Sequence, residues 1–327
     1  MKIFHRPSKE IMIASGILLF FIFLPFLLQN SGYAYVIRIF GLVGLYMIIA
    51  LGLNIVVGFL GLLDLGFMAF YAVGAYSMAL LSQRGWNFWP ALGVGMLITM
   101  SVRGLLGAPV LRLRGDYLAI VTLGFGEITR IVLNNWDSLT NGPKGISLLT
   151  DVNVKPVTFF GFPLSTNLHF YFLILLFVVL GVVLSRNLLN SRVGRAWTAI
   201  REDEVAARLI GIRVSRMKMI GFVASAAFAS IAGGIFARWE SFVTPESFKF
   251  WESVLLVAMV VIGGMGSIPG TLMGVFIVMA VPEILRNMLG ASLVSWRYFL
   301  FGIALVAVAL YRPQGLWPSQ RRTRPLE

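Results

Sequence analysis

The chain has 327 residues, of which 58% are hydrophobic and 13% are charged. An ordinary soluble domain is roughly half apolar and about a quarter charged, so this composition indicates an integral membrane protein. The formal net charge of +13 fits the excess of Lys and Arg in the cytoplasmic loops of membrane proteins, and we expect no nucleic-acid partner. The chain has no cysteine and only His5 and His169 as histidines, which excludes disulfides and argues against a metal site or other cofactor.

The N-terminal stretch "MKIFHRPSKE" is basic, and an apolar run follows it at 11–28. A secretory signal has a shorter apolar core of about 7–15 residues and a small-residue cleavage site. This run is longer, and no clear site of that kind follows it. We therefore expect 11–28 to be retained as a first membrane span.

Further apolar stretches, separated by Gly, Pro and charged residues, follow along the chain. A helix that crosses the bilayer core needs about 20 mostly apolar residues. On this criterion the sequence predicts an all-α, polytopic helical bundle with about ten transmembrane segments, at 11–28, 35–57, 61–82, 89–109, 117–135, 168–185, 219–239, 251–266, 268–289 and 296–311. The third is interrupted by glycine and the eighth is short, so a half-helix or a re-entrant segment is an open alternative for each.

The positions of Lys and Arg predict the orientation of this bundle. Basic residues gather in four stretches, at 1–10, 110–116, 186–218 and 312–327. The other loops hold only Arg84, Lys144, Lys155 and Lys249. Cytoplasmic loops carry the excess of basic residues, so we expect both termini, the loop 186–218 and the tail 312–327 in the cytoplasm, and the loop 136–167 in the periplasm. No loop is long enough for a soluble domain, so 1–327 is expected to form one transmembrane domain.

Several ionisable residues lie within the predicted spans, where a charge is costly and usually faces the bundle interior or a partner. They are Arg38, Asp64, Glu127, Arg130, Glu283 and Arg286. Glu127 and Arg130, like Glu283 and Arg286, are three positions apart and so share a helix face. Such a pair either neutralises itself near a helix end or lines a substrate path, and Glu127 is kept as a candidate path residue.

Two glycine-rich stretches interrupt the apolar pattern. In "GFLGLLDLGFMAF" (58–70) an aspartate lies among three glycines, and discontinuous helices of this kind often mark transport paths. Capping of a helix start is the alternative role of the aspartate. The stretch "GGMGSIPGT" (263–271) lacks the Lys of a phosphate-binding loop, so we interpret it as a backbone break or a close helix contact. The candidate path residues are Gly61, Asp64, Gly66, Glu127, Gly263 and Gly264.

The charged stretch "GRAWTAIREDEVAARLIGI" (194–212) lies between two apolar runs. Alanine, Glu and Arg favour a helix, and Gly211 suits its C-terminal end. Arg201 and Asp203 lie close to Ile200 in the sequence, so the pattern is not cleanly amphipathic, which argues against a helix lying on lipid. A lipid-surface helix, a solvated connector and a segment that couples to an ATPase all stay open on the residues alone.

Six motifs occur in a fixed order along about residues 35–316: "GLNIVVGFLGLLDLGFMAFYAVGAY", "LRLRGDYLAIVTLGFGEITR", "TNGPKGI", the stretch 194–212, "ESVLLVAMVVIGGMGSIPG" and "RPQGL". Together they resemble the M-type permease subunits of bacterial branched-chain amino acid ABC importers. The resemblance implies the inner-membrane fold of such permeases and no catalysis by the chain itself. It also implies a homologous H-type permease, two cytoplasmic ABC ATPase subunits and a periplasmic substrate-binding protein as partners.

The resemblance assigns the stretch 194–212 to ATPase coupling. Many permeases of ABC importers have a cytoplasmic loop with Glu-Ala-Ala, three further residues and Gly. Here Val205 is inserted after the Glu, and the Leu-Pro that often follows is missing. The coupling residues implied are Arg195, Arg201, Glu202, Asp203, Glu204, Ala206, Ala207 and Gly211.

Two alternative functions accompany this assignment. Related permeases serve importers of urea, amides or aromatic acids, so the substrate is less firmly indicated than the family. A self-sufficient, ion-coupled transporter is a different class and would use Asp64 or Glu127 as the ion carrier. A membrane enzyme is disfavoured, because the sequence shows no cluster of metal ligands or nucleophiles.

Overall fold

The computed structural model describes residues 34–111, 113, 116–149, 151–159, 162–164, 166–280, 283, 302, 306, 310–312 and 315–317. Its α-helices are α2 (Ala34–Leu53), α3 (Phe67–Gln83), α4 (Phe88–Val110), α5 (Asp116–Asn135), α6 (Asp137–Thr140), α7 (Asn167–Asn190), α8 (Arg192–Glu202), α9 (Glu204–Leu209), α10 (Val214–Glu240), α11 (Phe250–Gly263) and α12 (Ile268–Val275). Two π-helices, η1 (Asn54–Phe59) and η4 (Phe276–Ala280), extend α2 and α12, and η2 (Gly142–Lys144) and η3 (Pro245–Phe248) are short 3-10 turns. The strands are β1 (Ile146–Ser147), β2 (Thr158–Phe159), β3 (Phe162–Pro163) and β4 (Phe242–Val243).

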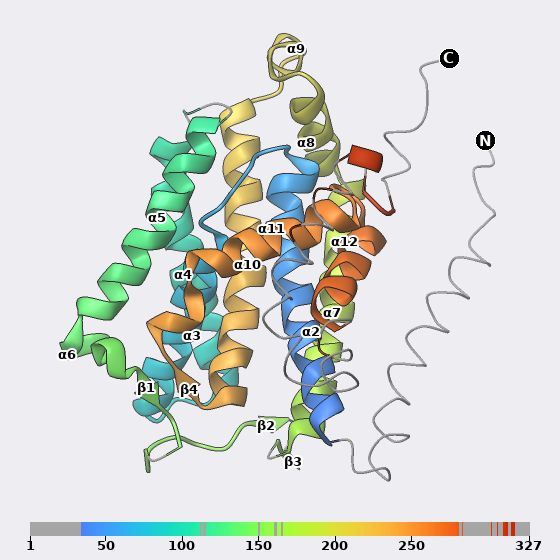
Figure 1. Cartoon of the computed structure of the whole chain (residues 1–327). Helices are drawn as coiled ribbons and strands as arrows, with labels where there is room; N and C mark the ends of the chain where they lie inside the picture. Colours follow the sequence, from blue (N-terminus) through green and yellow to red (C-terminus); the bar gives the residue numbers. More distant parts are fainter. Residues whose placement is uncertain are drawn as a thin grey trace.

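Five helices in the described part of the chain are long and apolar enough to cross a bilayer: Tyr35–Phe59, Phe88–Val110, Tyr117–Asn135, Asn167–Asn190 and Val214–Glu240. They run along the long dimension of the bundle (Figure 1). Each coincides with a predicted span. The predicted spans 11–28 and 296–311, and the end of 268–289, lie almost wholly outside the described residues.

Two predicted spans are shorter than expected. In the segment 61–82 the helix begins only at Phe67, because residues 60–66 are not helical. In the segment 251–266 the helix α11 has 14 residues, fewer than the roughly 20 that a complete crossing needs. Glycine interrupts the chain at both places. The 17 residues of α3 reach the lower limit of a spanning helix, whereas the 14 residues of α11 fit the half-helix alternative.

Helix α10 lies in the middle of the bundle and packs against α2, α3 and α4. Small residues allow α3 and α10 to approach closely, as is typical of helices in lipid. A Cβ atom added to Gly74 would lie 2.5 Å from the Cα atom of Ser230, and one added to Gly233 would lie 2.3 Å from the carbonyl oxygen of Tyr71. Close packing here fixes α3 against the centre of the bundle.

The two polar ends of the bundle are built differently. One end carries the loop 136–167, where β1 pairs antiparallel with β4 and β2 with β3. The opposite end carries α8 and α9, which project from the bundle (Figure 1). The loops 136–167 and 186–218 therefore lie at opposite ends of the bundle, and their assignment to the two sides of a membrane stays a prediction.

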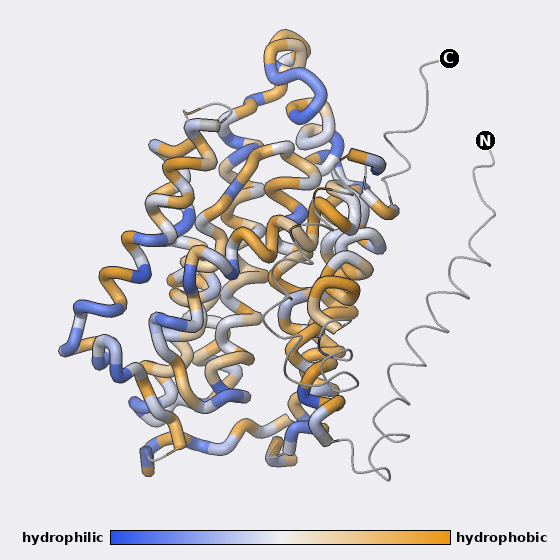
Figure 2. The backbone as a smooth tube through the Cα atoms, viewed as in Figure 1, coloured by the Kyte–Doolittle hydropathy of each residue, from blue (hydrophilic) through white to orange (hydrophobic). Residues whose placement is uncertain are grey.

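The sides of the bundle expose large apolar residues. Leu105 of α4 is 76% exposed and Tyr117 of α5 is 73% exposed. Figure 2 shows apolar residues along the length of the helices and hydrophilic ones concentrated near both ends. A surface of this kind needs lipid or a partner subunit to cover it, so the chain is a multi-pass membrane protein.

Candidate functional site

The helix α2 ends in a π-helix and an irregular turn at the first glycine-rich stretch. Residues Asn54–Phe59 form η1, and Gly61 follows with a φ of +72°. The second glycine-rich stretch separates α11 from α12, where Gly264 has a φ of +125° and Gly266 a φ of +83°. Only glycine adopts such backbone angles readily, so backbone breaks occur in both stretches, as the sequence predicts.

The two breaks, about 200 residues apart in the chain, contact each other. The backbone N–H of Gly266 donates to the Oδ1 atom of Asn54 at 2.9 Å. A Cβ atom added to Gly58 would lie 2.6 Å from the nitrogen of Gly266. The second break is also tightly packed within itself, because a Cβ atom added to Gly263 would lie 2.1 Å from the carbonyl oxygen of Gly270. Both proposed roles of "GGMGSIPGT", a break and a close helix contact, are therefore present.

The motif "RPQGL" near the C-terminus lies against the second break. The backbone N–H of Leu316 donates to the carbonyl of Ile262 at 2.9 Å, and that of Trp317 donates to the carbonyl of Gly263 at 3.0 Å. These donors satisfy carbonyls at the end of α11 that have no partner within the helix. The start of the predicted tail 312–327 thus belongs to the packed structure.

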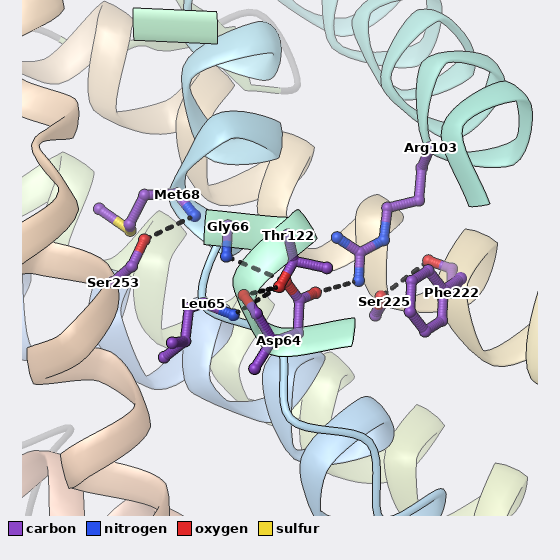
Figure 3. A network of polar contacts seen from close by, with 10 residues as sticks. Asp64, Leu65, Gly66, Met68, Arg103, Thr122, Phe222, Ser225 and Ser253 are labelled. Carbon is purple, nitrogen blue, oxygen red and sulfur yellow. Dashed lines mark hydrogen bonds and ion pairs between the residues drawn. The ribbon is translucent and has the colours of Figure 1, made fainter. Parts of the chain in front are cut away.

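Asp64 forms a buried ion pair with Arg103 of α4 (Figure 3). The Nη2 atom of Arg103 lies 2.5 Å from the Oδ2 atom of Asp64, and the two side chains are 1% and 0% exposed. The guanidinium also lies over aromatic rings, 4.1 Å from the centroid of Phe70 and 4.4 Å from that of Phe222. The carboxylate and the ring faces together compensate for burying a cation.

The ion pair belongs to a network that fixes the irregular segment 60–66. The N–H of Gly66 donates to Oδ1 of Asp64 at 3.1 Å, and the N–H of Leu65 donates to Oγ1 of Thr122 at 3.1 Å. A Cβ atom added to Gly66 would lie 2.0 Å from the carbonyl oxygen of Thr122. The segment is therefore held between α4 and α5. Asp64 turns the backbone just before α3 and, in this conformation, faces Arg103 and not an open path.

Arg103 was not among the ionisable residues that the sequence analysis singled out within the predicted spans. A single basic residue inside an apolar helix is a signal for an intramembrane partner, and "MSVRGLLG" contains one. The sequence does not show which carboxylate it meets, because Asp64 and Arg103 lie on different elements.

The predicted pair on α5 is confirmed. The Nε atom of Arg130 lies 2.9 Å from the Oε2 atom of Glu127, and its Nη1 atom lies 3.5 Å from Oε1 of Glu246. Glu127 borders a narrow crevice that includes Met68, Phe248 and Phe250. Both members of the pair are about 30% exposed, so this pair, unlike Asp64, remains accessible from outside the chain.

Two of the three remaining predicted charges also have partners. Arg38 pairs with Glu240 of α10 at 2.7 Å. Glu283 accepts a hydrogen bond from the hydroxyl of Tyr35. Its predicted partner Arg286 lies outside the described residues.

The charged stretch 194–212 forms two helices where one was expected. Asp203 separates them: its Oδ1 atom accepts from the N–H groups of Val205 at 2.7 Å and Ala206 at 3.0 Å. An aspartate that caps a helix in this way favours a new start over continuation. Gly211 follows α9 with a φ of +86°, so the predicted C-terminal stop is confirmed.

The helix α8 is amphipathic, contrary to expectation. Gly194, Trp197 and Ile200 recur every three residues and are buried. The indole N–H of Trp197 donates to the carbonyl of Met217 at 2.8 Å, so this face packs on α10. Arg201 and Asp203 both follow Ile200, with Arg201 in the last turn of α8 and Asp203 at the cap of α9.

Glu204 faces inward and not toward a partner. It lies 2.7 Å from the Nζ atom of Lys218, whose side chain is 4% exposed, and it also pairs with Arg208. Burial would raise the pKa of Glu204, but the hydrogen bond and charge of Lys218, with the charge of Arg208, bring it below its ordinary value. The carboxylate is therefore ionised at neutral pH and holds α9 to α10.

The remaining predicted coupling residues lie partly on the buried side and partly on the exposed side of α8 and α9. Ala207 is buried and Arg201 is half-buried, whereas four others are exposed, namely Arg195, Glu202, Asp203 and Ala206. The sequence interpretation missed an apolar tip at the far end of the projection (Figure 1). Val205 is 59%, Leu209 83% and Ile210 73% exposed. In the sequence these three apolar residues stand close to Glu204 and Arg208, and this pattern could have indicated an exposed apolar surface.

The architecture defines a class of protein: a membrane helical bundle with two broken helices inside and a helical projection at one end. Within the described residues, no three His, Asp or Glu side chains gather to hold a metal ion. Broken helices inside a membrane bundle are features of membrane transport permeases.

Comparison with known proteins identifies the family. A family model described as "branched-chain amino acid transport system / permease component" matches residues 35–309. The high-affinity branched-chain amino acid transport system permease protein LivM of Salmonella typhimurium and that of Escherichia coli are each 43% identical over 296 residues, 85% of this chain and 68% of the relative. The chain therefore belongs to this family of transport permeases, which confirms the resemblance seen in its motifs.

More distant relatives carry a different subunit name. The corresponding permease protein LivH of Escherichia coli is 26% identical over 286 residues, which is 83% of this chain and 90% of the relative. No solved structure matches the chain.

The ion pair generates a testable prediction. Replacing one partner, in Asp64→Asn or Arg103→Met, should lower the free energy of unfolding in detergent by about 3–5 kcal/mol, because the other charge stays buried without its partner. The double variant Asp64→Asn/Arg103→Met should lose less than the sum of the two single losses. Arg38→Met is the control: the pair with Glu240 is half exposed on the arginine side and should contribute at most about 1 kcal/mol. Additive losses in the double variant would contradict a direct interaction.

Proposed function

We propose that this chain is one of two permease subunits of an ATP-driven importer for branched-chain amino acids in the bacterial inner membrane. Separate ATPase subunits drive it and a periplasmic binding protein delivers the substrate. The observation that carries the proposal is the apolar tip of α9, an uncovered surface outside the bundle of a chain that is 43% identical to LivM. Similarity to LivH as well supports a path formed by two homologous permeases.

The charges support a cytoplasmic position for the projection. Arg192, Arg195, Arg213 and Arg216 are exposed around its base, as the positive-inside rule requires. The loop 136–167 at the opposite end then faces the periplasm, and both termini lie in the cytoplasm with about ten spans between them. The tip of α9 is placed where a cytoplasmic ATPase can cover it.

The carboxylates argue against an ion-coupled transporter. An ion carrier needs a carboxylate that exchanges its proton or cation during each cycle. Asp64 is held by Arg103 without access to solvent, and Glu127 is held by Arg130. Both candidate carriers are therefore occupied by arginine, which favours a separate source of energy.

Reconstitution tests the proposed function. Proteoliposomes with this chain, the second permease, the ATPases and the binding protein should accumulate radiolabelled leucine when ATP is supplied. This chain alone should accumulate none under an imposed proton or sodium gradient. Gradient-driven uptake by the lone chain would contradict the proposal. Competition by urea, an amide or an aromatic acid, with none by isoleucine or valine, would move the substrate to a related class.

Labelling tests the orientation. The chain has no cysteine, so single cysteines at Val152, which is 99% exposed, and at Ser215, also exposed, give clean reporters. A membrane-impermeant maleimide applied to intact spheroplasts should label Val152→Cys at once and Ser215→Cys only after permeabilisation. The reverse pattern would show that the bundle is inserted the other way round.

A substitution at the tip tests the docking surface. Leu209→Asp should weaken copurification of the ATPases by roughly tenfold or more, because burying a leucine contributes about 1.5–3 kcal/mol. Val152→Asp, equally exposed at the opposite end, should leave it unchanged. A charge reversal at Glu204 is less suitable, since it would leave Lys218 buried without its partner. Wild-type affinity in Leu209→Asp would exclude the tip from the contact.

A further inference from the structure

Arg201 is a side chain of the projection that contacts the first break. It lies near the end of α8, two residues before the capping Asp203. Its Nη1 atom donates to the backbone carbonyl of Gly58 in the π-helix η1. The residue is half-buried and points away from the apolar tip of α9. It therefore connects the proposed docking element to the first break.

Two glycines at positive φ make room for this side chain. A Cβ atom added to Gly61 would lie 2.7 Å from the Cγ atom of Arg201 and 3.5 Å from its Cβ and Cδ atoms. One added to Gly266 would lie 2.8 Å from Nη1 of Arg201 and 3.0 Å from the carbonyl oxygen of Gly58. Gly61 belongs to the first break and Gly266 to the second. The stem of Arg201 thus contacts one break, and its guanidinium lies where the two breaks meet.

The same junction continues into the network that fixes the segment 60–66. The N–H of Leu62 donates to the carbonyl of Val56 at 3.0 Å, so the segment is bonded back onto η1. Two residues later Asp64 pairs with Arg103 of α4. On the other side, Gly266 is bonded to Asn54. A displacement of the Gly58 carbonyl would therefore reach α3 and α4 through one break and α11 and α12 through the other.

The backbone at this junction is suited to move. A π-helix has a wider turn than an α-helix and is often found at functional sites. The Nδ2 atom of Asn54 is buried and has no hydrogen-bond partner among the described residues. An unpaired buried donor raises the free energy of the structure. A second arrangement of the junction, in which Nδ2 of Asn54 donates to an acceptor, would avoid this cost.

From these contacts we infer that Arg201 is the positioning residue through which movement of the projection changes both broken helices at once. The inference rests on the proposed function, because it needs an ATPase that moves α9. It assigns Arg201 a role different from docking: it transmits force inside the chain. A charge-assisted hydrogen bond to a backbone carbonyl is strong enough for this purpose and also directional.

Three substitutions in the assembled importer test the inference. Arg201→Gln removes the charge and shortens the reach, Arg201→Lys keeps the charge, and Arg192→Gln is the control for loss of a positive charge on an exposed position of the same helix. We measure the amount of assembled complex, ATP hydrolysis with and without the binding protein, and leucine transported per ATP. Arg201→Gln should assemble and hydrolyse ATP, but stimulation should be lost and leucine per ATP should fall about tenfold. Arg201→Lys should lie between it and the control.

A second pair approaches the junction from the membrane side. Gly61→Ala places a methyl group against the stem of Arg201 while α8 stays intact. Gly85→Ala is its control, because Gly85 also has a positive φ of +79° and the nearest atom to a Cβ there is 3.8 Å away. Gly61→Ala should also uncouple hydrolysis from transport. If Arg201→Gln and Gly61→Ala both keep the wild-type ratio of leucine to ATP, or if both merely reduce the amount of assembled complex, the inference is wrong.

The geometry is testable in the same complex. The distance of 3.5 Å between the positions of the two Cβ atoms suits a disulfide, so Gly61→Cys/Arg201→Cys should cross-link under mild oxidation. No cross-link in the folded complex would refute the contact. Failure of the proposed function would look different, because the wild-type complex itself would then show no ATP-dependent uptake.

Discussion

The lipid bilayer offers no hydrogen bonds to a peptide group, and the arrangement of this bundle depends on that constraint. Non-helical backbone at membrane depth is tolerated only where protein surrounds it. The segment 60–66 meets this condition with side chains, since Thr122 accepts from Leu65 and Asp64 accepts from Gly66. The turn between α11 and α12 meets it with Asn54 and with the backbone of residues 316–317. Each break is therefore stable only because distant parts of the chain close around it.

The need to surround the first break with protein also explains why a fully buried ion pair lies beside it, whereas the other ion pairs of the bundle stay near its surface. Arg103 and Asp64 tie the first break to α4 under full burial, where an unpaired charge would not persist. The charges on α5 and at Arg38 form pairs that remain partly exposed. A buried pair fixes a structural element, whereas an exposed pair on the outer helix α5 is available to a substrate or a second subunit. This division separates the interior of the chain from the face that the second permease would complete.

The sequence predicted the parts of the structure that depend on local pattern. Long apolar runs identified five spans, glycines identified both breaks, and Gly211 identified the end of α9. It did not predict contacts between elements. The pairing of Arg103 with Asp64 was not predicted, because the two residues lie on different segments. Glu204 was expected to face a partner subunit, because the local pattern does not show its contact with Lys218, 14 residues later. Asp203, which caps α9, is a residue type that often begins a helix. Strong helix formers on both sides of it nevertheless led to the expectation of one continuous helix.

The exposed tip of α9 has a consequence for the life of the protein in the cell. In the proposed importer, a newly inserted subunit would display the apolar residues Val205, Leu209 and Ile210 to the cytosol until an ATPase covered them. Chaperones and proteases act on exposed apolar surface and remove chains that present it. On this proposal, the docking surface would also act as a degradation signal that assembly conceals. The cellular level of the permease would follow the supply of ATPase subunits, and a subunit without its ATPase would not accumulate.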